Sequence, residues 1–164
     1  MMETASFPTT HSMAAVYRHY RDGSRKKLFE FLLDVPDEDF VRAVAGANGR
    51  SLRDLLVHLV DASGFWISLI QDRPHTALDP ADFATVESVI PVADESADRI
   101  DHVLRDADPD WFSREMAVTP GGIPQRVVPA QAFVHLLTHE FHHKGQIVLL
   151  ARMLGHEPPE TDYL

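Results

Sequence analysis

The stretch HLLTHEFHHKGQ, residues 135–146, holds four of the ten histidines of this chain. His135, His139 and His143 recur at every fourth position, so a helix would place all three on one face. Neighbours in this row would lie about 6 Å apart, which allows two rings to share a metal ion. The outer two would lie about 12 Å apart along the axis and cannot bind the same ion. The stretch therefore predicts one ligand pair, completed by at least one ligand from elsewhere.

The histidine stretch lies within the longest predicted helix. Pro129 suits the first turn of a helix and Gly155 is a natural C-terminal stop, so the helix is expected over residues 129–154, about 37 Å long. Before it, two short extended runs flank Gly121-Gly122 within residues 108–129. Such runs around a Gly-Gly pair predict a small hairpin or an ordered loop.

A second helix is predicted from Ser51 to about residue 71. Ser51 is a good N-cap, and Asp54 three residues later resembles a capping box with aspartate in place of glutamate. Apolar residues cover most of the circumference, so this helix should be largely buried. His58 lies on the same stripe as Leu55 and Ala62. It is either a neutral core histidine with a hydrogen-bond partner or a ligand that faces the last helix.

Two further helices complete the predicted architecture. The first covers residues 13–33 and ends before Pro36, and residues 36–50 and 72–83 are connectors. The third ends near Ala107, and a start close to Pro91 is favoured over a proline that kinks a longer helix. We therefore expect an all-α four-helix bundle with an N-terminal tail at residues 1–12 and one domain at residues 13–164.

The composition excludes several classes of protein. The chain has 164 residues, 45% of them hydrophobic, and a formal net charge of −10, with no basic run beyond residues 25–27, so a nucleic-acid binder is not expected. The absence of cysteine excludes disulfides, thiolate ligands and a cysteine nucleophile. No apolar run reaches the roughly 18 residues of a membrane span, and no signal peptide is recognisable. The expectation is a soluble cytoplasmic protein.

Bundle sites are formed by side chains that project inward from facing helices. His58, His139 and His143 would supply three neutral nitrogens, which suits Zn²⁺, Ni²⁺ or Fe²⁺ with one or more positions open to water or substrate. A closed site would instead indicate a bundle that binds metal without catalysis.

Two other motifs compete for the same stretch. Residues 139–143 match H-E-x-x-H, the zincin motif, in which Glu140 would be the general base. A zincin also needs a strand beside the helix and a third ligand. Glu140 and His143 match the Glu-x-x-His of di-iron bundles, but no other glutamate in the chain has a histidine three residues later. The candidates for a third zincin ligand are Glu157, Glu160 and Asp162.

The sequence resembles the DinB/YfiT-like metal-dependent four-helix proteins from about residue 13 onward. The residues that carry the resemblance are SLRDLLVH at 51–58 with Trp66, HEFHHKGQ at 139–146, and LGHEPP at 154–159. The resemblance implies that His58, His139 and His143 are the metal ligands. Lys144 stands where the family more usually has arginine.

The resemblance also implies a function. Family members bind divalent metals such as zinc or nickel, often form dimers, and include transferases and isomerases that use low-molecular-weight thiols. The expectation is a homodimeric metal-dependent enzyme acting on a small molecule, as a thiol S-transferase or a hydrolase, with the thiol supplied from outside. Gly145 is expected to allow close helix approach, and Gln146 either to orient a ligand or to pack.

Overall fold

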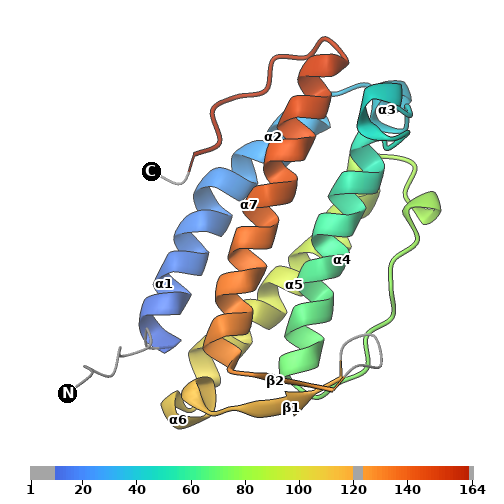
Figure 1. Cartoon of the computed structure of the whole chain (residues 1–164). Helices are drawn as coiled ribbons and strands as arrows, with labels where there is room; N and C mark the ends of the chain where they lie inside the picture. The colour runs from blue at the N-terminus through green and yellow to red at the C-terminus, as the bar shows by residue number, and fades with distance from the viewer. Residues whose placement is uncertain (1–9, 120–123, 163–164) are drawn as a thin grey trace.

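The computed structural model describes residues 10–119 and 124–162, and four helical rods dominate them (Figure 1). The first rod comprises α1 (Thr10–Tyr20), a π-helical turn η1 (Arg21–Arg25) and α2 (Lys26–Leu33). The others are α4 (Leu52–Ile70), α5 (Val86–Asp106) and α7 (Pro129–Met153). The short elements are α3 (Asp37–Phe40), η2 (Ala45–Ala47), η3 (Pro80–Asp82), α6 (Pro109–Ser113), β1 (Met116–Val118) and β2 (Gln125–Val127).

The helix pair α4 and α7 forms the most extensive contact in the bundle, and α5 packs against both α4 and α1. Burial of large side chains, such as Leu56 and Ile147 towards one end and Ile67 and Phe133 towards the other, stabilises the contact. Because α4 and α7 lie side by side, residues about 80 positions apart in the sequence can form a common site (Figure 1).

The start of α4 confirms the predicted capping box. The Ser51 hydroxyl accepts a hydrogen bond from the Asp54 backbone N–H at 3.1 Å, and the Asp54 carboxylate accepts one from the Ser51 N–H at 2.9 Å. The first rod begins at Thr10, three residues before the expected start. The end of α7 also matches the prediction, because Gly155 follows it with φ of 94°.

The predicted start of the third helix was wrong. Helix α5 begins at Val86 rather than near Pro91, because Thr85 and Ser88 form a capping box that fixes the N-terminus. Pro91 therefore lies inside the helix, where it removes one backbone hydrogen bond.

A two-stranded antiparallel hairpin precedes α7, with Met116 opposite Val127 and Val118 opposite Gln125. Gly121-Gly122 lies outside the described residues. The predicted four-helix bundle with a short hairpin before the last helix is thus confirmed. None of the described helices is both long enough and apolar enough to span a membrane.

Candidate metal centre

Three histidines from two adjacent helices form a cluster. His58 comes from α4, and His139 and His143 come from successive turns of α7. The ring centroid of His58 lies 5.4 Å from that of His139 and 4.5 Å from that of His143. The centroids of the two α7 rings are 4.3 Å apart. One nitrogen of each ring lies within 4.8 Å of the other two. The structure thus brings together the three residues that the sequence predicted as ligands.

The cluster is open on the α4 side. His143 is buried and His139 is half-buried, whereas His58 is exposed. The sequence placed His58 on the apolar stripe of a largely buried helix; the helix is largely buried, but this side chain reaches solvent. An open side leaves room for water or substrate, which is typical of catalytic rather than structural metal sites.

All three rings favour the neutral form that a metal ligand requires. Burial, and then repulsion from His143 and His58, lowers the pKa of His139 to about 4. Burial also lowers the pKa of His58, aided by the positive charge of Arg50. The pKa of His143 is lowered by burial and partly restored by a hydrogen bond to Gln146. At neutral pH the cluster therefore offers nitrogen lone pairs rather than positive charges.

Gln146, one turn after His143, orients two rings. Its side-chain oxygen lies 2.7 Å from Nδ1 of His143, and its side-chain nitrogen lies 3.0 Å from Nε2 of His142. The amide oxygen accepts a hydrogen bond from His143 Nδ1, which leaves Nε2 of that ring with its lone pair free. Such outer hydrogen bonds fix the tautomer of metal-binding histidines.

The donor set fits a divalent metal ion. Nε2 of His139 is buried and has no hydrogen-bond partner in the described part of the chain. A buried polar atom without a partner is costly, and a bound cation would satisfy it. Three imidazole nitrogens suit zinc or nickel, and the chain contains no thiolate to compete.

The other two histidines of the stretch lie beside the cluster. His135 is exposed, and its ring packs against Trp66 at 4.5 Å and stacks on His139 at 5.6 Å. His142 is exposed, with its ring edge-on to His143 at 4.9 Å. Neither belongs to the group of three nitrogens.

Glu140 points into the bundle rather than into the histidine cluster. Its side chain is 1% exposed and accepts hydrogen bonds from Ser63 Oγ at 2.6 Å and from Arg25 Nη1 at 3.4 Å. Arg25 also donates to the Tyr17 hydroxyl at 3.3 Å. The zincin interpretation is excluded because its general base is bound elsewhere and because His58 supplies the third nitrogen. We call Glu140, Arg25 and Ser63 the buried carboxylate network.

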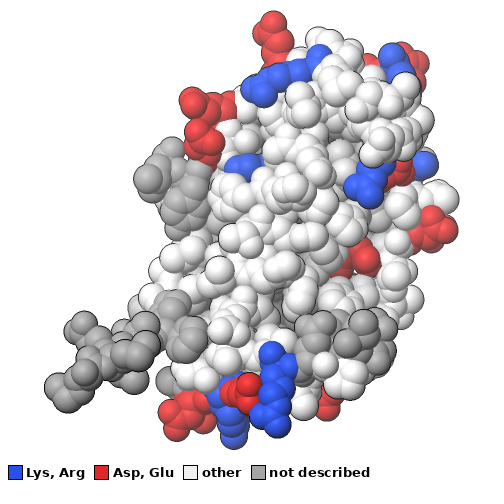
Figure 2. All heavy atoms as spheres, in the orientation of Figure 1, with Lys and Arg blue, Asp and Glu red and all other residues white. Residues whose placement is uncertain are grey.

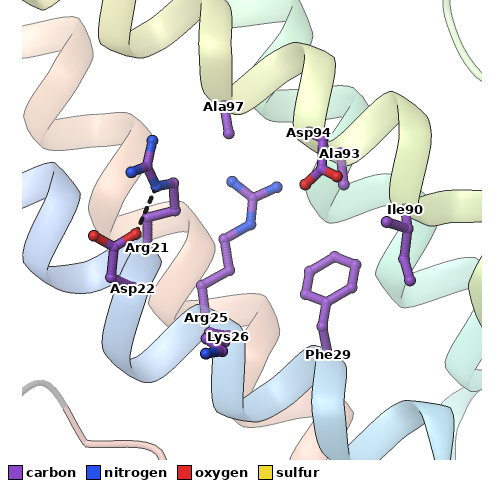
Figure 3. A pocket seen from close by; sticks show the side chains of 9 residues that line it. All are labelled: Arg21, Asp22, Arg25, Lys26, Phe29, Ile90, Ala93, Asp94 and Ala97. Atoms are coloured by element: carbon purple, nitrogen blue, oxygen red, sulfur yellow. Dashed lines mark hydrogen bonds and ion pairs between the residues drawn. The ribbon is translucent and has the colours of Figure 1, made fainter.

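A separate cavity of about 260 Å³ lies beside Arg25, between the η1–α2 segment and α5. Figure 3 shows the Arg25 side chain extending from η1 towards α5, with Phe29 on one side and Asp94 across from it. The cavity is lined by none of the three clustered histidines. It therefore belongs to the surroundings of the buried carboxylate network and not to the candidate centre.

The two residues after His143, Lys144 and Gly145, do not belong to the histidine cluster. A Cβ atom added at Gly145 would meet no atom of the described residues within 4 Å, so the expectation that this glycine permits close helix approach was wrong. Lys144 is buried, and its ammonium group donates hydrogen bonds to Ser24 Oγ at 2.7 Å and to the Thr161 carbonyl. The same ammonium nitrogen lies 4.0 Å from the centre of the Phe141 ring. Lys144 therefore anchors the C-terminal tail, away from the cluster.

The exposed side of α7 carries little charge. Between Gln131 and Leu149, a range described in full, no exposed residue is a lysine, arginine, aspartate or glutamate. Figure 2 shows the same face as a broad area without acidic or basic residues, with charges gathered towards its two ends and its rim. The exposed side of α7 next to the histidine cluster is therefore without charged side chains over this range.

Two comparisons with known proteins found similar sequences. The chain is 27% identical to the uncharacterized protein YizA of Bacillus subtilis (strain 168) over 109 residues, which cover 66% of this chain and 68% of that protein. The family comparison matches residues 2–164 to the DinB family. With nearly its whole length covered by this match, the chain belongs to the DinB family.

Proposed function

We propose that this protein is a metal-dependent enzyme that transfers a small thiol to an electrophile or hydrolyses a small molecule. The observation that carries the proposal is the cluster of His58, His139 and His143, which is open to solvent on one side. Within the described part of the chain, the buried Nε2 of His139 has no hydrogen-bond partner. A site with three protein ligands and an open side is the usual arrangement of a catalytic zinc centre.

The chemistry divides between the ion and the chain. When bound, a divalent ion such as zinc or nickel would act as a Lewis acid that lowers the pKa of a thiol or a water molecule. The three histidines hold the ion, and Gln146 keeps the His143 ring in the tautomer that presents Nε2. The 164 residues contain no cysteine, so a thiol nucleophile would come from solution.

The chain offers no general base from the HExxH motif. The carboxylate of Glu140 is buried and bound by Ser63 and Arg25, so it cannot reach a substrate at the exposed His58. A thiol is a more acidic nucleophile than water and requires less assistance from a base. For this reason thiol transfer is the favoured form of the proposal.

The test is an activity screen with defined metal content. Zinc-loaded and nickel-loaded protein would be assayed with cysteine, glutathione and 2-mercaptoethanol as thiols and 1-chloro-2,4-dinitrobenzene as the electrophile. We expect metal-dependent product formation that is lost in His139→Ala and retained in His135→Ala. Metal binding without turnover for any thiol or for ester substrates would favour a non-catalytic metal-binding bundle instead.

A further inference from the structure

A hollow of about 330 Å³ lies between the C-terminal half of α7 and the loop that leads into α4. Its walls are mostly apolar, and two of their side chains, Leu149 and Met153, are among the exposed large hydrophobic residues of the chain. Its lining includes Gly46, Arg50, Leu55, Gln146, Leu149 and Met153.

The loop wall of this hollow is held in a defined conformation. Val44 and Arg50 form an isolated antiparallel bridge, with the Val44 N–H donating to the Arg50 carbonyl at 3.0 Å. Asn48 and Gly49 adopt positive φ angles of 55° and 76°, and these angles turn the chain back on itself between Val44 and Arg50. A Cβ added at Gly46 would lie only 2.6 Å from Met153 Cε, so the loop rests directly on the end of α7.

The hollow adjoins the histidine cluster. Gln146 lines the hollow and also accepts the hydrogen bond from His143. Arg50 lines the opposite wall and directly precedes Ser51, the N-cap of the helix that carries His58. A molecule in the hollow would therefore have one end beside Gln146 and the nearby metal ligands.

The charge in the hollow indicates the kind of ligand. Arg50 is exposed, and among residues 10–119 and 124–162 no carboxylate forms an ion pair with its guanidinium group. By contrast, Arg42 pairs with Asp39, and Arg53 lies 3.6 Å from Asp54. A free guanidinium group can bind a carboxylate through two parallel hydrogen bonds, and one positive charge matches one carboxylate.

We propose that this hollow binds the electrophilic substrate of the metal centre, and that this substrate is a carboxylate with an apolar body. Arg50 holds the carboxylate, and Leu55, Leu149 and Met153 contact the apolar body. The identification of this ligand as a substrate rests on the proposed function, whereas binding of the carboxylate by Arg50 does not require a metal.

The experiment uses hexanoate as the probe and 1-hexanol as its uncharged counterpart. Each would be titrated into the full chain, metal-free and zinc-loaded, while NMR follows the methyl signals of Leu149 and Met153. We expect hexanoate to shift both signals in both forms of the protein. Arg50→Gln should weaken hexanoate binding at least about tenfold, to the level of 1-hexanol, because the ion-paired hydrogen bonds are lost.

The matched control is Arg152→Gln. Arg152 is an exposed arginine of α7, next to Met153, and it does not line the hollow. This variant removes the same charge from the neighbourhood and should bind hexanoate as the unchanged protein does. A similar loss in both variants would mean that only the general field of positive charge matters, and it would overturn the proposal.

Other outcomes would also overturn it. Hexanoate that binds only to the zinc-loaded protein, with no effect of Arg50→Gln, would show a carboxylate bound to the metal. Absence of any shift, together with a dimer in size-exclusion chromatography, would show that a second copy covers Leu149 and Met153. If zinc does not bind at all, the proposed function fails, but the metal-free titration still decides whether Arg50 binds carboxylates.

Discussion

Helix α7 carries two polar clusters on different faces, and consecutive residues belong to different clusters. His139 joins His58 and His143 in a group that is neutral and open to solvent. Glu140 lies about 100° further around the helix, within the bundle, where Arg25 and Ser63 bind its carboxylate. Among the described residues, Nε2 of His139 in the first cluster has no hydrogen-bond partner and adjoins two other ring nitrogens. In the second, Oε1 of Glu140 accepts hydrogen bonds from two other helical elements, while Oε2 is buried without a partner in the described part of the chain.

The comparison separates a binding role from a structural one within a single motif. A buried ion pair is costly to break because the remaining charge stays buried, so the carboxylate network fixes α7 against η1 and α4. Open neutral rings contribute less to folding and can instead bind an ion. The letters HExxH thus describe two structural environments, and each can be disrupted separately.

The largest expected effect is on stability, from loss of the buried carboxylate. Glu140→Ala should lower the free energy of unfolding by about 3–5 kcal/mol, because it leaves the Arg25 guanidinium buried without a counter-charge. Urea denaturation measures this. The control is Glu30→Ala, which removes an exposed carboxylate 3.7 Å from Lys26 and should cost less than about 1 kcal/mol.

The zinc content of Glu140→Ala tests whether the two clusters are separate. Folded Glu140→Ala should still bind zinc, because its histidines are intact. Zinc lost from the folded variant would mean that Glu140 belongs to the metal centre, and a stability change as small as that of Glu30→Ala would mean that the buried pair is not structural.

A smaller effect is expected for the residue that orients His143. Gln146→Ala should weaken zinc binding about 10–100-fold, because the His143 ring loses the partner that fixes its tautomer. Competition with a chromophoric chelator measures the affinity. Gln131, exposed on the first turn of α7, provides the control: Gln131→Ala should leave the affinity unchanged, and equal affinities in both variants would contradict the assigned role.

The smallest effect is expected at Gly145, an exposed glycine of α7. Gly145→Ala should raise the free energy of unfolding by up to about 1 kcal/mol, because alanine is the better helix former and its Cβ meets no atom of the described residues within 4 Å. Thermal denaturation measures the change. A clear loss of stability would instead support a close contact at this position.

The helices with strong local signals could be predicted from the sequence. Ser51 and Asp54 cap α4, and Gly155 ends α7, because capping depends on residues a few positions apart. At α5 the proline received too much weight: the capping box of Thr85 and Ser88, which uses serine at its last position, determines the start.

The clustering of the three histidines was also predictable, because the helical period brings His139 and His143 together and the family resemblance adds His58. The partners of Glu140 were not, since Arg25 and Ser63 lie 115 and 77 residues away and no local pattern relates them. Exposure of His58 was missed for a similar reason. A helical stripe shows which residues share a face but not where the edge of the neighbouring helix leaves a gap.

The central claim, that three histidines form one metal centre, is tested most directly by zinc stoichiometry. Calorimetric titration and elemental analysis would compare the unchanged chain with His58→Ala, His139→Ala, His135→Ala and His142→Ala. We predict one zinc ion per chain, lost in the first two variants and retained in the last two, whose rings lie outside the cluster. Full zinc occupancy in both His58→Ala and His139→Ala would contradict the account.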